Sequence, residues 1–401
     1  MRIAFYLNLQ GAGHCKRFDA IERCLPPDCE LAVVGMDKLP PVSLAGRAVE
    51  RVSVPGFAPR SRSLFMRQQT VHSYHDLLVN HGDNAAFTLE MVTFLSRWQP
   101  DLLVADVGLE ASILGRMCGI PVLYVRQHGR RWDKGHTLAY EWACSLWAPF
   151  AQELEQADCP TWIRNKTFYS GGFSRFSGQA KASIPPLSYG ISRGEALSES
   201  HRQAAAELLS PQPKNVLVMT GFGGTNITFD RVAEAAIALP QWRWHLIGIT
   251  PPTRNPDIPK NMFCHGVVKD VWSYLCFADL VVANAGHNSI MEISAADVPL
   301  VCIPAPRPFE EQVCKAEVLS ALQLCGVSLE WPSGAEWPSL FARAAELHRF
   351  SNADGAKLAW SQIQDAEAPM RAARFIYQIG RLCERPSGVA SEAYFSVRPG
   401  G

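Results

Sequence analysis

The sequence lacks the cysteine spacings of disulfide-rich and zinc-binding proteins, although it contains 12 cysteines in 401 residues. No two of them form a C-x-x-C pair, and Cys118, Cys276 and Cys302 lie within apolar runs. Disulfide frameworks belong mainly to short secreted chains, and structural zinc sites need closely spaced ligands. We therefore expect reduced thiols in the core of a cytoplasmic protein.

The sequence also lacks long apolar runs, and it has no excess of positive or negative charge. No apolar stretch approaches the roughly 20 residues that cross a bilayer, and no leader-like segment precedes the first strand-like run. The 38 basic and 38 acidic residues give a formal net charge of zero. Nucleic acid is not expected as a partner, because no overall field attracts it. The expected location is the cytoplasm, with peripheral contact at the inner face of a membrane left open.

Apolar runs of strand length alternate with helical patterns along the chain, which is typical of α/β folds with parallel sheets. The length of 401 residues exceeds that of one usual core, so two domains are expected. The predicted strands are residues 2–8, 30–35, 101–106, 121–126, 215–220, 242–249, 279–284 and 299–303. The predicted helices are residues 14–24, 71–98 with a break near Gly82, 109–118, 137–157, 199–209, 228–239, 288–296, 311–322 and 366–382.

Two segments of the chain, residues 101–125 and 279–303, align without a gap at one constant offset. Gly108 pairs with Gly286, and each segment reads as a strand, a glycine turn, a helix and a second strand. This match favours two similar Rossmann-like halves. The predicted domains are an N-terminal acceptor domain at 1–175, an interdomain segment at 176–212, a C-terminal donor domain at 213–365, and at 366–401 a helix returning to the first domain with a loose tail.

A glycine-rich turn, TGFGGTN at residues 220–226, follows a predicted strand of the second half. Ligands of doubly wound sheets bind beyond the carboxyl ends of the strands, and glycines leave backbone N–H groups free for a diphosphate. The turn lacks the lysine of a P-loop, which argues against nucleoside triphosphate chemistry. A purely structural turn is the alternative. The candidate ligand-binding residues are Gly221, Gly223, Gly224 and Thr225.

The next strand end carries NAGHNSIMEI at residues 284–293, where a glycine turn delivers small donors to a helix start. Glu292 lies one turn further on, and its carboxylate can accept hydrogen bonds from two ribose hydroxyls. A third turn, at residues 304–312, opens a helix with Glu311 and Gln312, which can hold sugar hydroxyls. Ordinary helix caps and solvated acids are the alternatives. The candidates at the second turn are Gly286, His287, Asn288, Ser289 and Glu292.

The run of residues 265–312 resembles the donor half of GT-B glycosyltransferases. It is similar to the family 28 transferases that add N-acetylglucosamine to lipid I, and to UDP-glycosyltransferases with the signature HCGWNSxxE. Asn284 stands in place of the first histidine of that signature, and His287 in place of its tryptophan. The resemblance implies that Glu292 binds ribose and that backbone near Val268 meets the nucleobase. It further implies that Glu311 and Gln312 bind the donor sugar, in an α/β fold of two Rossmann-like domains facing across a cleft.

The first half contributes the turn GAGH at residues 11–14, which resembles the glycine–histidine turn of the same proteins. The resemblance implies that His14 is the catalytic base and that Asp106, in VADVG, orients it. A neutral imidazole can take the proton of an acceptor hydroxyl, and a carboxylate behind it fixes its tautomer. Gly11 and Gly13 are expected to clear room for acceptor and donor sugar. Helix capping is the alternative for both His14 and Asp106.

The acceptor is less clearly indicated. Segment 126–136 follows a strand of the first half, so its basic and aromatic side chains are expected to face the cleft. His128 and His136 are alternative bases, and Arg130, Arg131 and Trp132 can hold an anionic or sugar acceptor. Segment 59–67 interleaves arginines with apolar residues and suits a lipid-linked acceptor. The acceptor-side residues predicted are Gly11, Gly13, Arg17, His128 and Arg130.

The predicted function is therefore an inverting transfer of a sugar from a nucleoside diphosphate sugar, with UDP expected, to a hydroxyl acceptor. No metal or cofactor is expected, because no DxD-like motif stands at a suitable strand end. The pattern G-x-G-H-x-x-R at residues 11–17 also resembles a UDP-sugar hydrolase of the same fold. A hydrolase or epimerase is therefore one alternative, and a non-catalytic nucleotide-sugar-binding protein is another.

Overall fold

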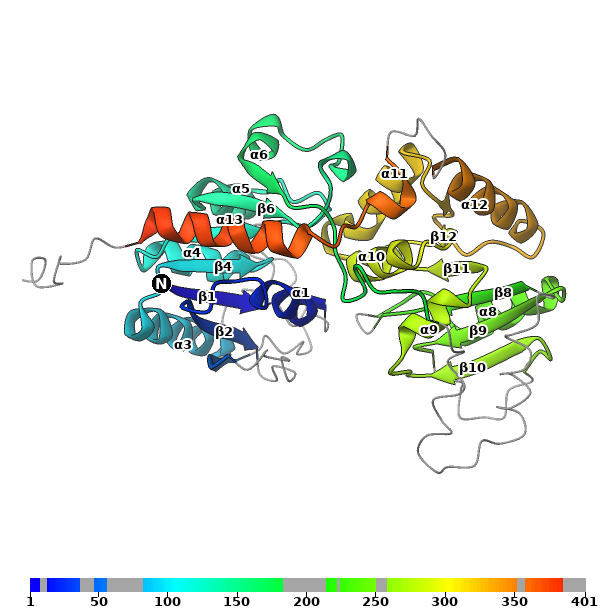
Figure 1. The fold of residues 1–401 in the computed structure, drawn as a ribbon, viewed down its shortest axis with the longest axis horizontal. Helices are drawn as coiled ribbons and strands as arrows, with labels where there is room; N and C mark the ends of the chain where they lie inside the picture. The colour runs from blue at the N-terminus through cyan, green and yellow to red at the C-terminus, as the bar shows by residue number, and fades with distance from the viewer. Residues whose placement is uncertain are drawn as a thin grey trace, which may run out of the picture.

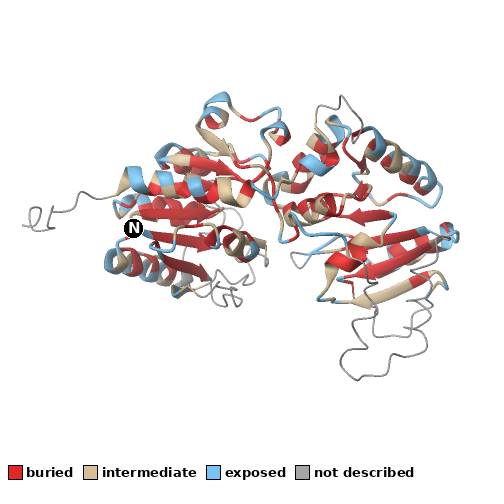
Figure 2. Cartoon of the chain, in the orientation of Figure 1, coloured by how far each residue is buried: buried red, intermediate tan, exposed pale blue. Residues whose placement is uncertain are grey.

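The computed structural model describes residues 1–7, 13–36, 47–55, 82–182, 214–221, 224–249, 258–351 and 358–384. They form two halves, each built on one parallel sheet with helices packed on both faces (Figure 1). The strands at the centre of each half are buried, and the covering helices alternate buried with exposed positions (Figure 2). Among the described helices, none combines the length and the apolar character that a membrane span requires.

The N-terminal half carries a seven-stranded sheet in the order β3-β2-β1-β4-β5-β6-β7, and all neighbouring strands are parallel. Side chains alternate between its two faces, as the strand period requires. Phe5 packs toward α1 (Gly13–Glu22) and α13 (Ala368–Cys383), whereas Tyr6 packs toward α3 (Gly82–Trp98) and α4 (Leu109–Met117). The strands are β1 (Arg2–Leu7), β2 (Glu30–Met36), β3 (Val49–Val54), β4 (Leu102–Asp106), β5 (Val122–Val125), β6 (Ser145–Ala148) and β7 (Thr167–Tyr169). The helices are α1 (Gly13–Glu22), α3 (Gly82–Trp98), α4 (Leu109–Met117), α5 (Lys134–Trp142) and α6 (Thr161–Lys166).

The C-terminal half carries a six-stranded parallel sheet in the order β10-β9-β8-β11-β12-β13. Leu217 and Val218 point to opposite faces and enter two separate buried clusters. The strands are β8 (Lys214–Met219), β9 (Trp242–Ile247), β10 (Met262–Gly266), β11 (Leu280–Ala283), β12 (Leu300–Cys302) and β13 (Gly326–Val327). The helices are α8 (Phe229–Ala238), α9 (Val271–Cys276), α10 (His287–Ala296), α11 (Glu311–Ala321) and α12 (Trp337–Ser351).

The last helix, α13 (Ala368–Cys383), crosses back from the C-terminal half and lies along the N-terminal half (Figure 1). Its small residues Ala372 and Ala373 and the larger Ile376 are fully buried against the N-terminal sheet. Pro369 lies in the first turn of this helix. Proline is tolerated there, because a backbone N–H in the first turn has no hydrogen-bond acceptor within the helix. The predicted terminal helix at 366–382 is confirmed to within two residues.

The internal match found in the sequence corresponds to equivalent places in the two sheets. Strands β1, β4 and β5 adjoin in the first sheet, and β8, β11 and β12 adjoin in the same order in the second. Helix α4 follows β4 as α10 follows β11, so each aligned segment is one βαβ unit. The predicted α/β fold with two Rossmann-like halves is confirmed.

One predicted helix, at residues 137–157, is wrong. Helix α5 ends at Trp142, and the following residues form strand β6, in which Trp147 and Ala148 are buried between β5 and β7. Pro149 directly after the strand disfavours a continuing helix. The prediction also omitted strands β3, β7, β10 and β13 and helices α6, α9 and α12. The predicted helix at 199–209, residues 71–81 of another, and the tail at 385–401 lie outside the described residues.

Candidate active site

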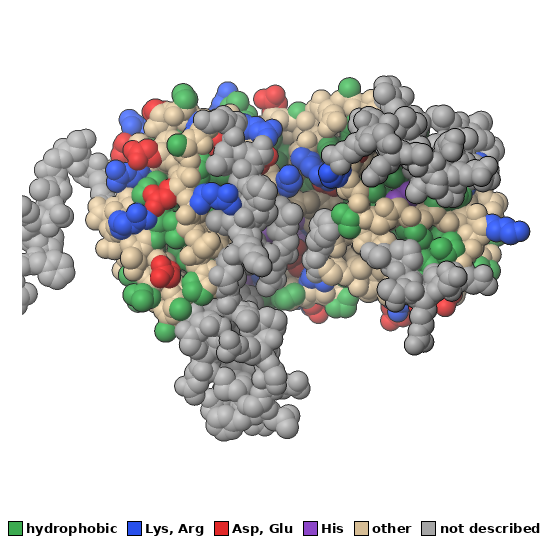
Figure 3. All heavy atoms as spheres, turned by 90° about the horizontal axis from the view of Figure 1, so that it is seen from below, with side chains coloured by type: hydrophobic (Ala, Val, Ile, Leu, Met, Phe, Trp, Pro, Cys, Tyr) green, Lys and Arg blue, Asp and Glu red, His purple; other side chains and the backbone are tan. Residues whose placement is uncertain are grey.

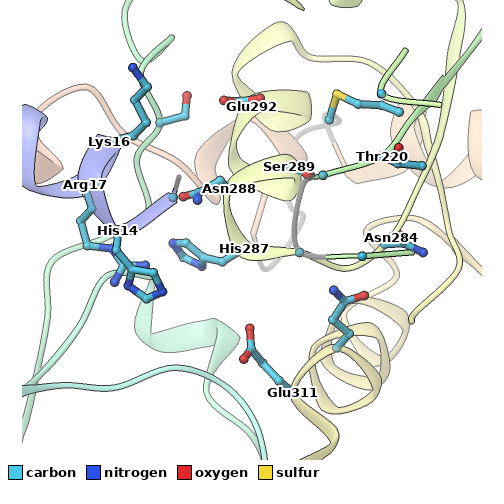
Figure 4. A pocket seen from close by; sticks show the side chains of 18 of the residues that line it. His14, Lys16, Arg17, Thr220, Asn284, His287, Asn288, Ser289, Glu292 and Glu311 are labelled. Carbon is cyan, nitrogen blue, oxygen red and sulfur yellow. The ribbon is translucent and has the colours of Figure 1, made fainter. Parts of the chain in front are cut away.

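His14 and Asp106 meet where the first sheet ends. His14 is the second residue of α1, and Asp106 is the last residue of β4, the strand next to β1. Nδ1 of His14 lies 2.9 Å from Oδ2 of Asp106, and the Asp106 side chain is buried. The structure therefore brings together the two residues predicted for base catalysis. The opposite ring edge of His14 faces the cleft between the halves (Figure 4).

The second oxygen of Asp106 is held by Arg17, one turn further along α1. Nη1 of Arg17 donates to Oδ1 of Asp106 at 2.5 Å, and both side chains are buried. Burial alone would raise the pKa of Asp106, but the charges and hydrogen bonds of Arg17 and His14 outweigh it and hold the pKa below its ordinary value. Asp106 is therefore a fixed carboxylate at neutral pH, suited to orient the imidazole of His14.

The chain bends sharply just after Asp106. Val107 adopts a left-handed conformation with φ of 56°, which a β-branched residue rarely does. It lines the cleft, next to the carboxylate. Strained backbone of this kind persists only where the surrounding structure holds it, and it occurs often at functional sites.

The N-terminus of α10 faces His14 across the cleft (Figure 4). Gly286 is its N-cap and provides no side-chain cap, so the first N–H groups of the helix have no intrahelical partner. Such a helix start attracts anions. The two halves approach closely here: a Cβ on Gly13 would lie 1.9 Å from Nδ2 of Asn288, so a larger residue at this position of α1 would displace the Asn288 side chain. Ser289 lines the same part of the cleft.

The turn after β8 forms a second wall of this anion-binding region. Gly221 and Gly224 line the cleft, and Gly224 has a φ of 92°, which favours glycine. Nη2 of Arg307, from the turn after β12, donates to the carbonyl of Gly224 at 2.6 Å and lines the cleft as well. The sequence prediction did not include Arg307. Gly223 and Gly11 lie outside the described residues.

Thr225 holds the turn together and does not line the cleft. Its hydroxyl donates to Oδ1 of Asn284 at 2.7 Å, and Nδ2 of Asn284 donates to Oδ1 of Asn226 at 2.8 Å and to the carbonyl of Ile303 at 2.7 Å. These bonds tie the turn after β8 to the ends of β11 and β12. The hydroxyl of Thr225 is therefore engaged within the protein, and donor binding by Thr225 stays a prediction.

Glu292, on the second turn of α10, lines the cleft and accepts a hydrogen bond of 2.8 Å from Nε of Arg175. Burial raises the pKa of Glu292, and the charge of Arg175 partly offsets that effect. Arg175 comes from the segment that leaves β7, and its guanidinium also lies over the ring of Phe176, 4.5 Å from the centroid. Arg175 was not among the predicted site residues.

Glu311 and Gln312 begin α11, and both line the cleft. Oε2 of Glu311 lies 3.1 Å from Nη2 of Arg131, which comes from the N-terminal half. Oε1 of Gln312 accepts from the backbone N–H of Ala305 at 2.8 Å, which leaves its amide group as a donor to the cleft. The preceding residues Phe309 and Glu310 both have left-handed backbone, with φ of 58° and 55°.

Two of the predicted acceptor residues do not reach the cleft. His128 is 1% exposed and points into the N-terminal half, where Nε2–H donates to the carbonyl of Leu154 at 2.7 Å. Burial, with the charge of Lys315, holds the pKa of His128 well below its ordinary value, so it is neutral. Arg130 points outward and pairs with Glu310 at 3.0 Å. The cleft on this side is lined instead by Lys16, Gln127 and Arg131, of which Lys16 and Gln127 were missed.

The cleft encloses about 460 Å³ between the two halves, enough for a ligand the size of a nucleotide sugar. Seen from below, the described residues leave a furrow between the halves, with basic side chains on its rim (Figure 3). Val268, together with Val267, lines its end beside β10 and α9. In the described ranges, no group of three or more His, Cys, Asp or Glu side chains is arranged to hold a metal ion.

Comparison with known proteins agrees with this architecture. Residues 261–332 match the glycosyltransferase family 28 C-terminal domain. Over 241 residues, 58% of this chain and 60% of the relative, the sequence is 23% identical to the UDP-N-acetylglucosamine–N-acetylmuramyl-(pentapeptide) pyrophosphoryl-undecaprenol N-acetylglucosamine transferase of Haemophilus ducreyi. It is 28% identical over 236 residues to an uncharacterized glycosyltransferase of Methanosarcina acetivorans, covering 53% of this chain and 55% of that protein.

Solved structures match almost the whole chain. The glycotransferase of kitacinnamycin superposes with a TM-score of 0.61 at 16% identity, covering 94% of this chain and 98% of that one. The spinosyn rhamnosyltransferase SpnG, complexed with thymidine diphosphate, gives a TM-score of 0.57 at 14% identity and 95% coverage of both chains. The UDP-GlcNAc 2-epimerase of Methanocaldococcus jannaschii gives a TM-score of 0.56 at 12% identity, covering 94% of this chain and 100% of that one.

The chain has a two-domain GT-B fold, and its residues 261–332 are similar to the C-terminal domain of glycosyltransferase family 28. The family 28 match falls on the part of this GT-B protein that contains β10, α10 and α11, and hence most of the C-terminal wall of the cleft. The alignments with the first three curated relatives span 32% to 60% of those proteins' lengths.

Proposed function

We propose that this protein transfers a sugar from a nucleoside diphosphate sugar, with UDP as the expected nucleotide, to a hydroxyl acceptor, with inversion and without a metal. The observation that carries the proposal is the pairing of two sites across one cleft. His14, backed by Asp106, reaches it from the N-terminal half, and the uncapped start of α10 reaches it from the other. A base and an anion site on opposite walls suit an in-line displacement.

The donor is expected to lie along the C-terminal wall. The diphosphate binds the N–H groups at Asn288 and Ser289 and the turn at Gly221 and Gly224, with Arg307 close by, because these groups supply partial and full positive charge. A further set of contacts follows from the resemblance to UDP-glycosyltransferases. Glu292 accepts from the ribose hydroxyls, Glu311 and Gln312 bind hydroxyls of the sugar, and Val267 and Val268 meet the nucleobase.

The reaction needs one proton transfer and one displacement. The acceptor hydroxyl gives its proton to Nε2 of His14 while its oxygen forms the new bond to the anomeric carbon. The bond from that carbon to the diphosphate oxygen breaks, and the electron pair leaves with the nucleoside diphosphate. The helix start and Arg307 stabilise the charge that develops on the leaving group. Attack from the side of His14, opposite the diphosphate, inverts the configuration.

Water in place of the acceptor would make the protein a hydrolase, and the fold is shared with a solved UDP-GlcNAc 2-epimerase. The basic side chains of Lys16 and Arg131 on the acceptor side favour a larger, polar or anionic acceptor. We place the reaction in the cytoplasm or at the inner face of a membrane, with a lipid-linked acceptor as one class to test. The apolar and basic segment at 59–67 lies outside the described residues.

The test is to incubate the purified protein with a panel of labelled nucleotide sugars, with and without cell extract as the source of acceptor. Nucleoside diphosphate release and labelled products are measured together, the latter by mass spectrometry. The proposal expects release that depends on the extract and a product one sugar heavier than its precursor. Release at full rate without extract would instead identify a hydrolase or epimerase. Tight binding of nucleoside diphosphate with no turnover of any donor would identify a non-catalytic binding protein.

A further inference from the structure

A buried lysine lies directly behind a histidine of the cleft wall. Nζ of Lys315, on the second turn of α11, lies 3.1 Å from Nδ1 of His287, the first residue of α10. Lys315 is 4% exposed and is not part of the cleft lining, whereas His287 is 8% exposed and lines it. The histidine thus stands between the ammonium group and the cleft, and its ring is directed into the space toward α1 (Figure 4).

The chemistry of the two groups fixes the tautomer of His287. A lysine ammonium has three donors and no acceptor, so the contact to Nδ1 requires an unprotonated Nδ1. A neutral ring with Nδ1 unprotonated carries its hydrogen on Nε2. An imidazolium at this place is disfavoured as well, because burial, the charge of Lys315 and the charge of Arg17 all hold the pKa of His287 well below its ordinary value.

His14 shows the opposite arrangement on the other wall. Its Nδ1 faces the carboxylate of Asp106 at 2.9 Å, which accepts a hydrogen, so the neutral ring presents an unprotonated Nε2 to the cleft. An acidic group behind one imidazole makes it a proton acceptor, and a basic group behind the other makes it a donor. The two rings therefore have opposite polarity toward anything bound between them.

We propose that Lys315 is a positioning residue that holds His287 as a neutral Nε2–H donor to an oxygen of the glycosyl donor. This rests on the proposed function, since the acceptor of that hydrogen bond is a sugar or phosphate oxygen of a nucleoside diphosphate sugar. The neutral donor has a physical advantage at the start of α10, where the helix dipole disfavours a cation. The signature of UDP-glycosyltransferases has tryptophan at the position of His287, so that signature does not include this role.

The test uses nitrogen NMR of the 15N-histidine-labelled protein, which reads the tautomer without any substrate. The resonances of His287 are assigned by their loss in His287→Gln. The wild type is expected to show a protonated Nε2 and an unprotonated Nδ1 at pH 7. Lys315→Met keeps an unbranched side chain as far as Cε but removes the ammonium. In this variant the nitrogen chemical shifts of His287 are expected to move toward those of a mixture of tautomers. Lys166→Met is the matched control, because Lys166 also donates one hydrogen bond, to the carbonyl of Glu141, away from the cleft.

Kinetics separate this inference from the proposed function. Lys315→Met is expected to lower the turnover of the nucleotide sugar roughly tenfold or more, as the loss of a positioned donor does. The double variant with His287→Gln should lose no more than His287→Gln alone, because Lys315 acts through the histidine. A protonated Nδ1 in the wild type overturns the inference, even if Lys315→Met fails to fold. Unchanged shifts in Lys315→Met overturn it too. The expected tautomers with no turnover of any donor would leave the positioning intact and contradict the proposed function.

Discussion

His14 reaches the cleft with one ring nitrogen already engaged, since Nδ1 faces Asp106 and Asp106 is held in turn by Arg17. The order of contacts explains why the carboxylate stays ionised although it is buried. It also explains why the ring can take a proton only at Nε2, on the side that an acceptor would occupy. The chemistry proposed for this site depends on that one free nitrogen.

His14→Ala is expected to lower turnover by about 10² or more while affinity for the donor stays near that of the wild type. The reason is that the donor binds on the opposite wall, so only the proton acceptor is lost. Steady-state kinetics and a calorimetric titration of the nucleoside diphosphate measure the two quantities. His348→Ala is a suitable control, because His348 pairs with Asp297 away from the cleft. Turnover that survives His14→Ala would show that another group is the base.

Lys315 gives a prediction about stability and pH. Burial lowers its pKa to about 8, against an ordinary value of 10.5 in the unfolded chain. Between pH 8 and pH 10.5 the lysine binds more protons in the unfolded state than in the folded state. The free energy of unfolding therefore rises with pH across this window. Relative to Lys315→Met, the wild type should gain up to about 3 kcal/mol from pH 7.5 to pH 10.5. Denaturant unfolding of both proteins at several pH values measures the difference, and parallel curves would contradict it.

Residues near a recognisable motif were predictable, and residues that join distant segments were not. His14, Asp106 and Glu311 lie at strand ends or helix starts, which is where α/β proteins bind ligands, and Glu292 lies one turn into a helix that follows a strand end. Arg175 and Arg307 carry no local pattern, because their partners lie 117 and 83 positions away in the sequence. His128 was predicted to face the cleft, but it is buried in the N-terminal half. A position after a strand end does not determine whether the side chain points into the cleft or into the core.

At the scale of elements, helix α13 shows how a C-terminal segment can stabilise the N-terminal sheet. Its buried face is made of small residues and Ile376, and its exposed positions are Arg374, Gln378, Arg381 and Leu382. Ile376→Ala is expected to lower the free energy of unfolding by about 2–4 kcal/mol, because it leaves a cavity in a fully buried cluster. Arg374→Ala, on the exposed face of the same helix, should change it by less than about 0.5 kcal/mol. Equal effects in denaturant unfolding would mean that α13 does not pack as described.

Most of the long, strongly patterned elements were predictable, whereas the missed elements are short apart from α12, which has 15 residues. Buried parallel strands such as β1, β4 and β11 are continuous apolar runs, and α10 and α13 have clear helical patterns. Strand β6 has only four residues and follows α5 with a gap of two, so the helical pattern was extended across it. Strand β10 is half-buried and short, and its pattern resembles that of a loop.

At the scale of the whole molecule, the two halves are joined by close backbone packing. A Cβ on Gly172, beyond β7, would lie 2.3 Å from the carbonyl oxygen of Ile363 and equally near Sδ of Met291 on α10. Gly172→Ala is expected to lower the free energy of unfolding by about 1–3 kcal/mol through overpacking. Gly221→Ala is the control for unfolding, since its added methyl meets no atom of the described residues within 4 Å. An equal change in both variants would contradict the tight junction at Gly172.

The overall architecture was predictable from the internal match between residues 101–125 and 279–303, which revealed two similar βαβ units. The contacts between the two halves were not predictable from the sequence, because pairs such as Arg131 and Glu311 lie 180 positions apart in it. The domain boundaries remain predictions from composition, and the predicted interdomain segment lies largely outside the described residues.

The central claim is that the C-terminal wall of the cleft binds a nucleoside diphosphate. Calorimetric titration with the common nucleoside diphosphates and their monophosphates tests it most directly. The account predicts that one diphosphate, UDP by expectation, binds one-to-one and at least about tenfold more tightly than its monophosphate, because the start of α10 and Arg307 contact the second phosphate. Equal affinity for the two, or no binding of any nucleoside diphosphate, would contradict it.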